Sequence, residues 1–341
     1  MQGFAYKKKD KIGYERALYF VESLLYAKKQ KEKQETSFMT IDFRKELIEI
    51  TEETRVQAQE PRSRHTTFRL GGNADYLVDA KNADEVKALI DLCKRENVPF
   101  YVIGNGSNIL VGDKGYRGVI IRIFKHMNEV WVKECVVYAQ AGALLSKIAN
   151  AALAESLTGF EFAAGIPGTL GGAVVMNAGA YGGELKDVLQ WAEVVTDDGE
   201  ILRLSAEELE LGYRTSIIAK KGYVVLGGAI QLQKSDKDKI KAQMDDLKER
   251  RITKQPLEYP SAGSTFKRPV GYFAGKLIDD AGLRGFKLGG AQVSQKHCGF
   301  VINTGNATAK DVVDLIEEVQ KRVKGNAGVT LETEVRRLGD F

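Results

Sequence analysis

The chain has 341 residues, of which 43% are hydrophobic and 28% charged, and a formal net charge of +4. This length predicts two or three domains. The positive excess lies in residues 1–38, with nine Lys/Arg against five Asp/Glu, so the remaining 41 basic and 41 acidic residues balance. A balanced globular part argues against nucleic-acid binding. No apolar run reaches the roughly 18 residues that a membrane span needs.

The cysteines and histidines are few and far apart. Cys93, Cys135 and Cys298 do not form a disulfide framework or a zinc-binding pattern, and only three histidines are present. This usage fits a protein of the reducing cytoplasm.

Residues 1–38 form an extension of different character. Tyr14, Leu18 and Val21 fall at helical spacing, and lysines follow from residue 28. Two interpretations stay open, a solvated tail and a basic amphipathic helix that contacts a membrane surface or a partner. Glu22 interrupts the apolar stretch and no small-residue cleavage site follows, so a secretory signal is not expected.

From residue 66 onward, predicted strands and helices alternate, which indicates an α+β protein. Strands are predicted at 74–79, 100–103, 119–123, 130–140, 223–232, 299–302 and 329–338, and helices at 83–96, 144–153, 234–254 and 308–324. A hairpin is predicted at 193–204, closed by Asp197-Asp198-Gly199. The charged helix at 234–254 predicts a boundary before a third structural unit.

Two glycine-rich segments are candidate cofactor sites. The first follows the strand at 100–103 and consists of Gly104, Asn105, Gly106, Ser107, Asn108 and Ile109. Its backbone N–H groups can converge on a phosphate or pyrophosphate, although a tight polar turn has the same composition. The pattern lacks the Gly-x-Gly-x-x-Gly fingerprint of dinucleotide-binding folds.

The second segment spans residues 164–183 and holds seven glycines among residues 165–183. Backbone with so few side chains can lie against a large flat cofactor, and the alternative is a loop rich in turns. The candidate contacts are Gly165, Ile166, Pro167, Gly168, Gly171, Gly172, Ala173, Asn177 and Ala178.

Three further segments carry polar groups suited to catalysis. Arg214 can hold a carboxylate or phosphate in two-point contact. Ser264 is a candidate proton donor with Lys267 and Arg268 just beyond it, and Glu334 is a candidate acid, base or charge partner. Taken alone, each has a structural alternative, namely a salt bridge, a capped turn or a surface strand. No Gly-x-Ser-x-Gly elbow is present, which argues against a hydrolase serine.

In this order, the segments resemble the UDP-N-acetylenolpyruvoylglucosamine reductase family, also called UDP-N-acetylmuramate dehydrogenase. The resemblance runs from Thr66 to Arg336 and is most specific at residues 164–181 and 262–269. It implies a two-domain FAD-binding module of the vanillyl-alcohol-oxidase type and a C-terminal α+β substrate-binding domain. The expected boundaries are 39–125, 126–250 and 251–341, with a last strand that returns to the first subdomain.

The resemblance also implies a reaction of cytoplasmic peptidoglycan precursor synthesis. NADPH reduces FAD, and the flavin then reduces enolpyruvyl-UDP-N-acetylglucosamine to UDP-N-acetylmuramate. The implied roles are Arg214 at the substrate carboxylate with Glu334 nearby, and Ser264 as proton donor. We further expect Glu334 to be protonated, and Lys267 and Arg268 to bind the diphosphate. The expected partner is this small nucleotide sugar, without nucleic acid or integral membrane association.

Two departures from the wider group refine these expectations. No room exists between Arg214 and the strand at 223 for an inserted tyrosine-bearing loop, so the chain resembles the shorter, loop-lacking type. No histidine lies in 104–110 or 164–183, so noncovalent FAD is predicted. Two alternatives stay open, another FAD-dependent dehydrogenase or oxidase of the same fold group and a non-catalytic flavin- or nucleotide-sugar-binding protein.

Overall fold

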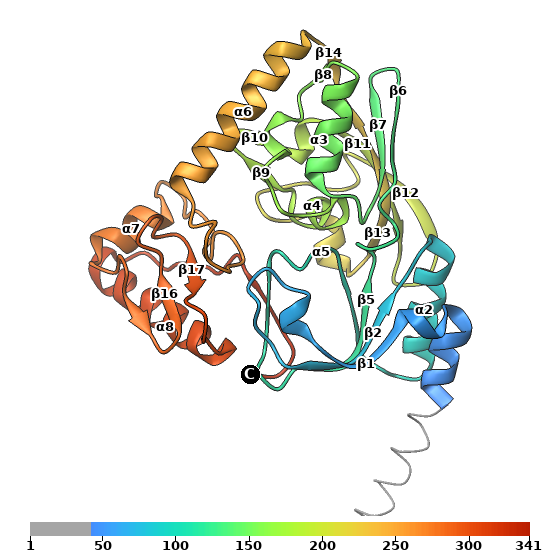
Figure 1. Cartoon of the computed structure of the whole chain (residues 1–341), viewed down its shortest axis with the longest axis horizontal. Helices are drawn as coiled ribbons and strands as arrows, with labels where there is room; N and C mark the ends of the chain where they lie inside the picture. The colour runs from blue at the N-terminus through green and yellow to red at the C-terminus, as the bar shows by residue number, and fades with distance from the viewer. Residues whose placement is uncertain (1–41) are drawn as a thin grey trace, which may run out of the picture. The chain divides into compact units, whose positions relative to one another are not determined.

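The computed structural model describes residues 42–341, so the predicted extension at 1–38 lies outside the described residues. The chain divides into two units after Glu52. Residues 42–50 of the first unit are helical. All the strands described here lie in the second unit, residues 53–341 (Figure 1).

The first sheet has four strands in the order β1-β2-β5-β3. Its strands are β1 (Val56–Pro61), β2 (Asn73–Asp79), β5 (Tyr116–Arg122) and β3 (Phe100–Ile103), with the 3-10 helices η1 (Glu53–Arg55) and η2 (Arg62–Arg64) flanking β1. β1 and β2 are antiparallel, whereas β2, β5 and β3 run parallel. Parallel strands need a long crossover, and α2 (Ala83–Arg95) lies in the one between β2 and β3.

Helix α2 forms because its sequence has both a cap and an apolar face. The Asn82 side chain accepts a hydrogen bond from the Glu85 amide at 2.9 Å, which satisfies one of the unpaired N–H groups at the helix start. The predicted inward face is at most 2% exposed, at Val86, Leu89, Ile90 and Cys93.

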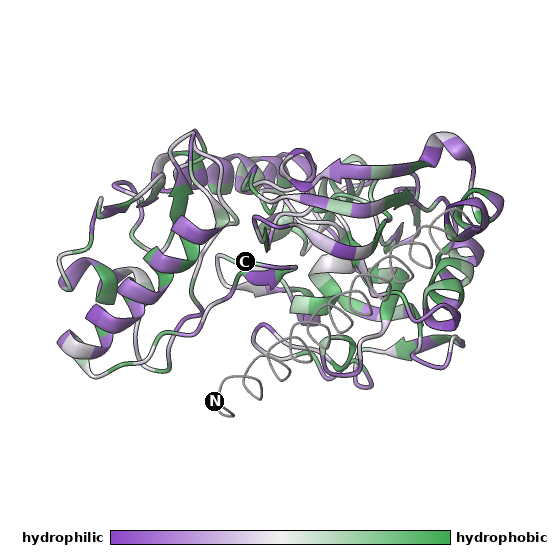
Figure 2. Cartoon of the chain, turned by 90° about the horizontal axis from the view of Figure 1, so that it is seen from below, coloured by the Kyte–Doolittle hydropathy of each residue, from purple (hydrophilic) through white to green (hydrophobic). Residues whose placement is uncertain are grey.

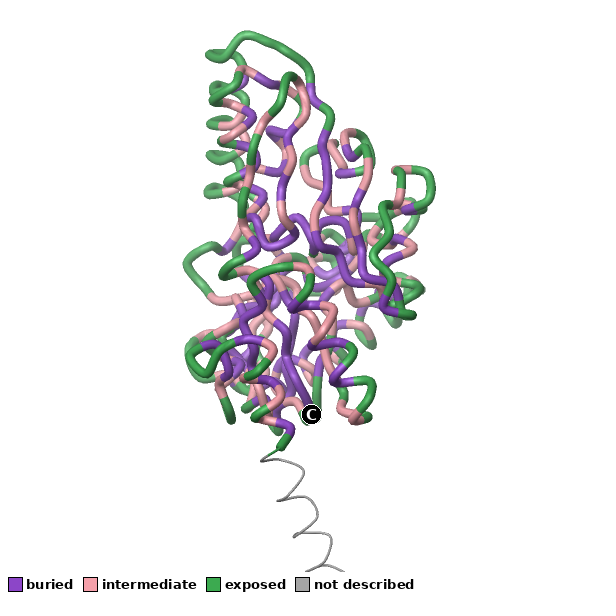
Figure 3. Tube along the Cα trace, turned by 90° about the vertical axis from the view of Figure 1, so that its right-hand side faces the viewer, coloured by how far each residue is buried: buried purple, intermediate pink, exposed green. Residues whose placement is uncertain are grey.

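The second sheet has five antiparallel strands in the order β12-β11-β13-β7-β6. Its strands are β6 (Val130–Lys133), β7 (Val136–Gln140), β11 (Leu189–Val195), β12 (Ile201–Ser205) and β13 (Val224–Gln231). Helices α3 (Leu145–Ala154) and α4 (Leu170–Met176) contact this sheet, and α5 (Ile217–Lys221) contacts α4. Strand β13 is buried at all but two of its residues, and in Figure 3 buried stretches of the chain run through the interior between exposed loops.

Short elements join these layers. They are β8 (Leu157–Thr158) paired with β14 (Gln233–Lys234), β9 (Gly179–Ala180) paired with β10 (Gly183–Glu184), and the 3-10 helices η3 (Glu161–Ala163) and η4 (Leu185–Asp187). The long helix α6 (Lys237–Lys254) leads to the C-terminal part and buries only Ile240, in keeping with its hydrophilic surface (Figure 2).

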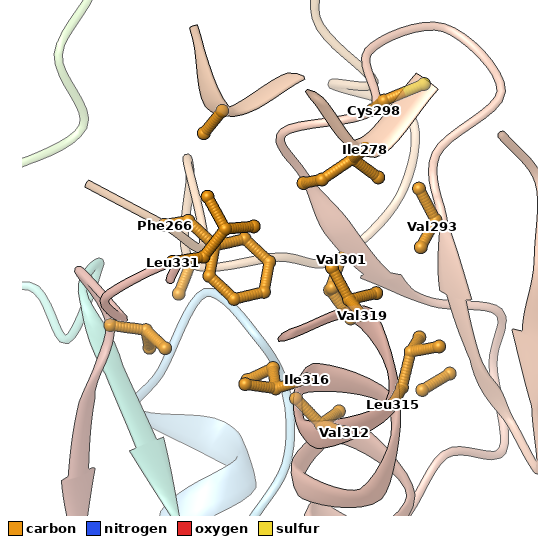
Figure 4. Close-up of a cluster of buried hydrophobic side chains, with 14 of the residues drawn as sticks. Phe266, Ile278, Val293, Cys298, Val301, Val312, Leu315, Ile316, Val319 and Leu331 are labelled. Atoms are coloured by element: carbon orange, nitrogen blue, oxygen red, sulfur yellow. The ribbon is translucent and has the colours of Figure 1, made fainter. Parts of the chain in front are cut away.

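The C-terminal part has its own core. Strands β15 (Lys287–Leu288), β16 (Ala291–Val293) and β17 (Val301–Asn303) form an antiparallel sheet beside α7 (Ala274–Asp280) and α8 (Ala309–Ala327). Figure 4 shows side chains of α8 packed toward those of α7 and these strands. The last strand, β18 (Arg336–Leu338), pairs in parallel with β4 (Ile109–Val111).

Most predicted elements are confirmed, including the hairpin at 193–204 and the start of α8 at its Thr308 cap, and three predictions are wrong. The predicted strand 130–140 is a hairpin of β6 and β7, because Glu134 takes a left-handed φ of 57° at the turn. The glycine-dense segment contains helix α4 rather than loop alone. The predicted strand 329–338 is regular only at β18.

Candidate functional site

The structure brings the two glycine-rich segments together. The Asn105 side chain donates a hydrogen bond to the Pro167 carbonyl at 2.7 Å. A Cβ added at Gly104 would lie 2.2 Å from Thr169 Oγ1, so only glycine allows this approach. Gly106 has φ of +62°, and an added Cβ would lie 2.2 Å from the His65 carbonyl oxygen. Glycine at 104 is therefore required by the packing of the two segments, and glycine at 106 by the packing of the first segment against His65 and Thr66.

The same segments hold hydrogen-bond donors that the protein itself does not use. Within residues 42–341, none of the backbone N–H groups of residues 105–108 donates to a protein acceptor. The Thr169 hydroxyl is buried and likewise has no partner among these residues. Successive free N–H groups in a concave turn bind anions, so this part of the chain fits the diphosphate of a dinucleotide such as FAD.

Three of the other predicted cofactor contacts, Gly168, Gly172 and Asn177, differ in their surroundings. At Gly168 and Gly172, an added Cβ would meet its nearest neighbour at 3.8 Å, which is ordinary van der Waals contact, so packing within the protein does not require glycine at these two positions. Asn177 is different, because its side chain is 0% exposed and its amide nitrogen donates to Glu184 and to the Gly212 carbonyl. The side chain of Asn177 therefore faces protein.

A pocket of about 390 Å³ contains the three predicted catalytic residues, Arg214, Ser264 and Glu334. Arg214 Nε donates to Glu334 Oε1 at 2.6 Å, across 120 positions of sequence. Their side chains are only 17% and 14% exposed. A partly buried, charge-assisted hydrogen bond of this length is among the stronger polar contacts in proteins.

Backbone pairing explains why Ser264 and Glu334 line the same pocket. The Glu334 amide donates to the Thr265 carbonyl at 2.8 Å, and Phe266 forms an antiparallel bridge with Thr333. Thr265 is buried, and its Oγ1 accepts a hydrogen bond from the Val301 amide of β17. The segment that carries Ser264 is therefore held between the C-terminal sheet and the segment that carries Glu334.

The environment of Glu334 favours its neutral form. Burial raises the pKa of this carboxyl above its ordinary value, while the Arg214 charge and hydrogen bond and the more distant Lys267 lower it. Burial is the larger effect, because removing a carboxylate from water disfavours the charged state. This direction agrees with the expectation of a raised pKa at Glu334.

Several lysine and arginine side chains also line the pocket, and most of them pair with carboxylates. Lys276 pairs with Asp280, Arg284 with Asp279 at 2.6 Å, and Lys296 with Glu258 at 3.7 Å. Sequence reasoning missed these three residues and His297, which also lines the pocket. They are spread over residues 276–297, and no spacing signal marks them.

Arg268 and Lys267, the two predicted diphosphate residues, are placed differently. Arg268 lines the pocket, stacks at 4.0 Å over the Phe273 ring, and has no carboxylate partner among residues 42–341. Lys267 is not among the residues that line the pocket, and its ammonium lies 3.1 Å from Glu332. The structure therefore brings one of the two predicted cations to the catalytic residues.

His65 is a residue near the cofactor segments that sequence reasoning missed. It lines a second pocket with Gly104 and Asn105. Its Nε2 lies 2.8 Å from Glu60, and Arg122 lies 2.6 Å from its Nδ1. Because a guanidinium only donates, Nδ1 must accept, so the ring is neutral with its proton on Nε2. Burial lowers the pKa of His65, in agreement with this assignment. Both nitrogens are thus engaged.

Among residues 42–341, no helix is long and apolar enough to cross a bilayer. Within the same range, no cluster of His, Cys, Asp and Glu suits a metal ion.

Comparison with known proteins agrees with this geometry. Residues 74–205 match the family described as FAD binding domain, so the chain is an FAD-binding protein. Residues 255–338 match the family described as UDP-N-acetylenolpyruvoylglucosamine reductase, C-terminal domain.

The alignments with similar proteins cover nearly the whole length of those proteins. The chain is 56% identical over 299 residues to UDP-N-acetylenolpyruvoylglucosamine reductase of Lachnoclostridium phytofermentans, covering 86% of this chain and 96% of that protein. It is 52% identical to the Clostridium novyi protein of the same name, covering 88% and 98%.

A solved structure leads to the same family. The UDP-N-acetylenolpyruvylglucosamine reductase of Thermus caldophilus aligns with a TM-score of 0.73 and 35% identity, over 83% of this chain and 99% of that one. The chain therefore belongs to the UDP-N-acetylenolpyruvoylglucosamine reductase family. This confirms the predicted family, the α+β fold class with an FAD-binding module and a C-terminal domain, and FAD as cofactor.

Proposed function

We propose that this protein reduces enolpyruvyl-UDP-N-acetylglucosamine to UDP-N-acetylmuramate in peptidoglycan precursor synthesis, with NADPH as the hydride donor and noncovalent FAD. The relatives at 52% and 56% identity are named as reductases of UDP-N-acetylenolpyruvoylglucosamine. The observation that carries the proposal is the pocket that joins Arg214, Ser264 and Glu334. Bound FAD would supply the redox chemistry, the transfer of a hydride from NADPH to the substrate.

Arg214 and Glu334 are proposed to hold the enolpyruvyl carboxylate. Hydride addition to an enol ether places negative charge on that carboxylate as the enolate develops. A guanidinium fixed in a partly buried pocket stabilises this charge more strongly in the transition state than in the ground state, which is the requirement for catalysis. A neutral Glu334 can donate a hydrogen bond to the same group, and the raised pKa of Glu334 favours that form.

Ser264 is proposed to deliver the proton to the neighbouring carbon. Its hydroxyl lines the same pocket, in a segment held by the Glu334 amide and by β17. A serine hydroxyl is a weak acid at its ordinary pKa, so its contribution depends on fixed position and on reprotonation after transfer.

Arg268 is proposed to bind the substrate diphosphate. The other pocket cations are paired with carboxylates, whereas the Arg268 guanidinium is not, within the part of the chain that the structure describes. Phosphate oxygens are suitable acceptors for its planar donors. Lys267 is given a secondary role, because it does not line the pocket and its ammonium pairs with Glu332 at 3.1 Å.

The short connection after Arg214 supports the assignment to the type that lacks an inserted tyrosine-bearing loop. The short helix α5 occupies most of the connection between Arg214 and β13.

We further propose domain boundaries near residues 125 and 250, and the cytoplasm as the compartment of the protein.

The direct test is product identification. Purified protein is incubated with NADPH and enolpyruvyl-UDP-N-acetylglucosamine, and the product is analysed by mass spectrometry. The proposal predicts NADPH consumption that requires this substrate, and a product heavier by two hydrogen atoms. NADPH oxidation without a reduced nucleotide sugar would contradict it.

A further inference from the structure

A buried asparagine lies behind the turn that carries the catalytic arginine. Asn177 ends helix α4 in the left-handed conformation, with φ of 42° and ψ of 62°, and is 0% exposed. Its amide nitrogen donates to Glu184 Oε2 at 3.0 Å and to the Gly212 carbonyl at 3.1 Å. Its amide oxygen accepts from the Lys186 backbone at 2.9 Å. Both donor hydrogens are therefore used within the protein.

The Gly212 carbonyl belongs to the tight turn that presents Arg214. The Gly212 amide donates to the Thr215 carbonyl at 3.1 Å, and the Thr215 amide donates back at 3.2 Å. Between them, Arg214 has a left-handed φ of 56°. A residue with a bulky side chain adopts this conformation only under strain, so surrounding contacts must maintain it.

The segment around Asn177 supplies several of those contacts. Ser216 Oγ donates to the Val175 carbonyl at 2.9 Å, and Arg214 Nη2 donates to the Gly179 carbonyl at 3.4 Å. Asn177 lies between these two acceptors in sequence and holds the start of the turn. Residues 175–179 therefore contact the beginning, the middle and the end of the turn.

Glu184 completes the arrangement. Besides the Asn177 amide, it accepts a hydrogen bond from Lys186 Nζ at 2.9 Å. The Lys186 hydrogen bond lowers the pKa of Glu184, with a smaller contribution from Asn177, so it stays a carboxylate acceptor. One Asn177 hydrogen is thus fixed on a charged acceptor, which orients the other toward Gly212.

We infer that Asn177 is a positioning residue for Arg214, acting through the Gly212 carbonyl, and that its side chain does not contact FAD. This inference rests on the proposed function, in which Arg214 binds the substrate carboxylate. Asn177 then matters for the step in which the substrate reoxidises the flavin, and not for FAD binding or for flavin reduction by NADPH. A displacement of about 1 Å at a catalytic group is sufficient to slow a reaction about 100-fold.

The test is Asn177→Gly. Glycine adopts the left-handed conformation without strain, so this variant removes the hydrogen bonds and leaves the backbone preference intact. Asn97→Gly is the matched control, because Asn97 is also left-handed, with φ of 52°, but is exposed at the end of α2. Flavin content and the two half-reactions are measured separately by anaerobic stopped-flow absorbance.

In N177G we expect a 10- to 100-fold lower limiting rate of reoxidation by enolpyruvyl-UDP-N-acetylglucosamine, about the scale of a misplaced catalytic group. Flavin content and the rate of reduction by NADPH stay within about twofold, and N97G matches the wild type throughout. If N177G fails to fold, Asn177→Asp takes its place, because aspartate also tolerates this conformation and keeps the side-chain shape. It loses both donors and places a second carboxylate opposite Glu184, so the expected loss in reoxidation is at least as large.

Three results would overturn the inference. They are reoxidation at the wild-type rate in the variant, an equal loss in both half-reactions, and loss of bound FAD. A wild-type protein whose reduced flavin is not reoxidised by this substrate would instead refute the proposed function, so the two failures are distinguishable.

Discussion

The approach of Gly104 to Thr169 gives the sharpest test of how the cofactor segments are packed. In Gly104→Ala, the new Cβ would lie 2.2 Å from Thr169 Oγ1, where ordinary contacts begin at 3.4 Å. Thr169 is only 1% exposed and has little room to move away. The segment at residues 104–109 must therefore shift, and overpacking of this kind costs about 1–3 kcal/mol.

Because the N–H groups of residues 105–108 are expected to hold the FAD diphosphate, a shift of this segment should weaken FAD binding by a similar free energy. At about 1.4 kcal/mol per factor of ten, G104A should raise the dissociation constant for FAD about 5- to 150-fold. The assay is titration of the apoprotein with FAD, followed by flavin fluorescence. Gly325→Ala in α8 is the control, because nothing lies within 4 Å of the added Cβ, and its affinity should be unchanged.

A second substitution tests the cause. Thr169→Ala removes Oγ1 and Cγ2, so the nearest remaining Thr169 atom is Cβ at 3.2 Å. The double variant G104A/T169A should therefore bind FAD more tightly than the sum of the single effects predicts, by about 0.5–3 kcal/mol. Wild-type FAD affinity in G104A, or strictly additive effects in the double variant, would refute the packing argument.

The remaining predictions concern the pocket. Ser264→Ala should slow flavin reoxidation by the substrate about 100-fold or more and leave reduction by NADPH unchanged; an equal loss in both steps would contradict a proton-donor role. Arg268→Ala should raise the KM for the nucleotide sugar about 10-fold or more, the worth of charge-assisted hydrogen bonds, whereas Lys267→Ala should change it less than threefold; the reverse order would contradict the assignment. Because the pKa of Glu334 is raised by burial, its neutral form is lost as pH rises through that pKa, so the reoxidation rate should fall on the alkaline side. Glu334→Gln, which stays neutral, should lose that dependence in a pH series of stopped-flow rates; an unchanged profile would show that another group titrates.

Local sequence signals predicted the elements well where pattern and cap agree. In α8, Thr308 accepts from the Asp311 amide and the predicted inward residues are buried, because an apolar stripe at helical spacing has one stable way to pack. In contrast, β18 is only three residues long and pairs with β4, a strand of the same length more than 200 residues away. Pairing at that distance leaves no local trace in the sequence.

The candidate site was predictable only in part, for the same reason. The motifs identified Arg214, Ser264 and Glu334 through resemblance to a family, and the structure joins them in one pocket. Composition alone did not separate Arg268 from its neighbour Lys267, since that difference depends on the direction of adjacent side chains in an extended segment. Asn177 lies in a cofactor motif, yet its partners come from residues 184–212, which only the fold reveals.

The central claim is tested most directly by anaerobic flavin spectroscopy of the purified protein. NADPH is added first, and enolpyruvyl-UDP-N-acetylglucosamine is added to the reduced protein. We expect NADPH to bleach the oxidised flavin band, and the band to recover only when this substrate is present. Reduction without recovery would contradict the substrate assignment, and a protein that neither contains nor takes up FAD would contradict the account as a whole.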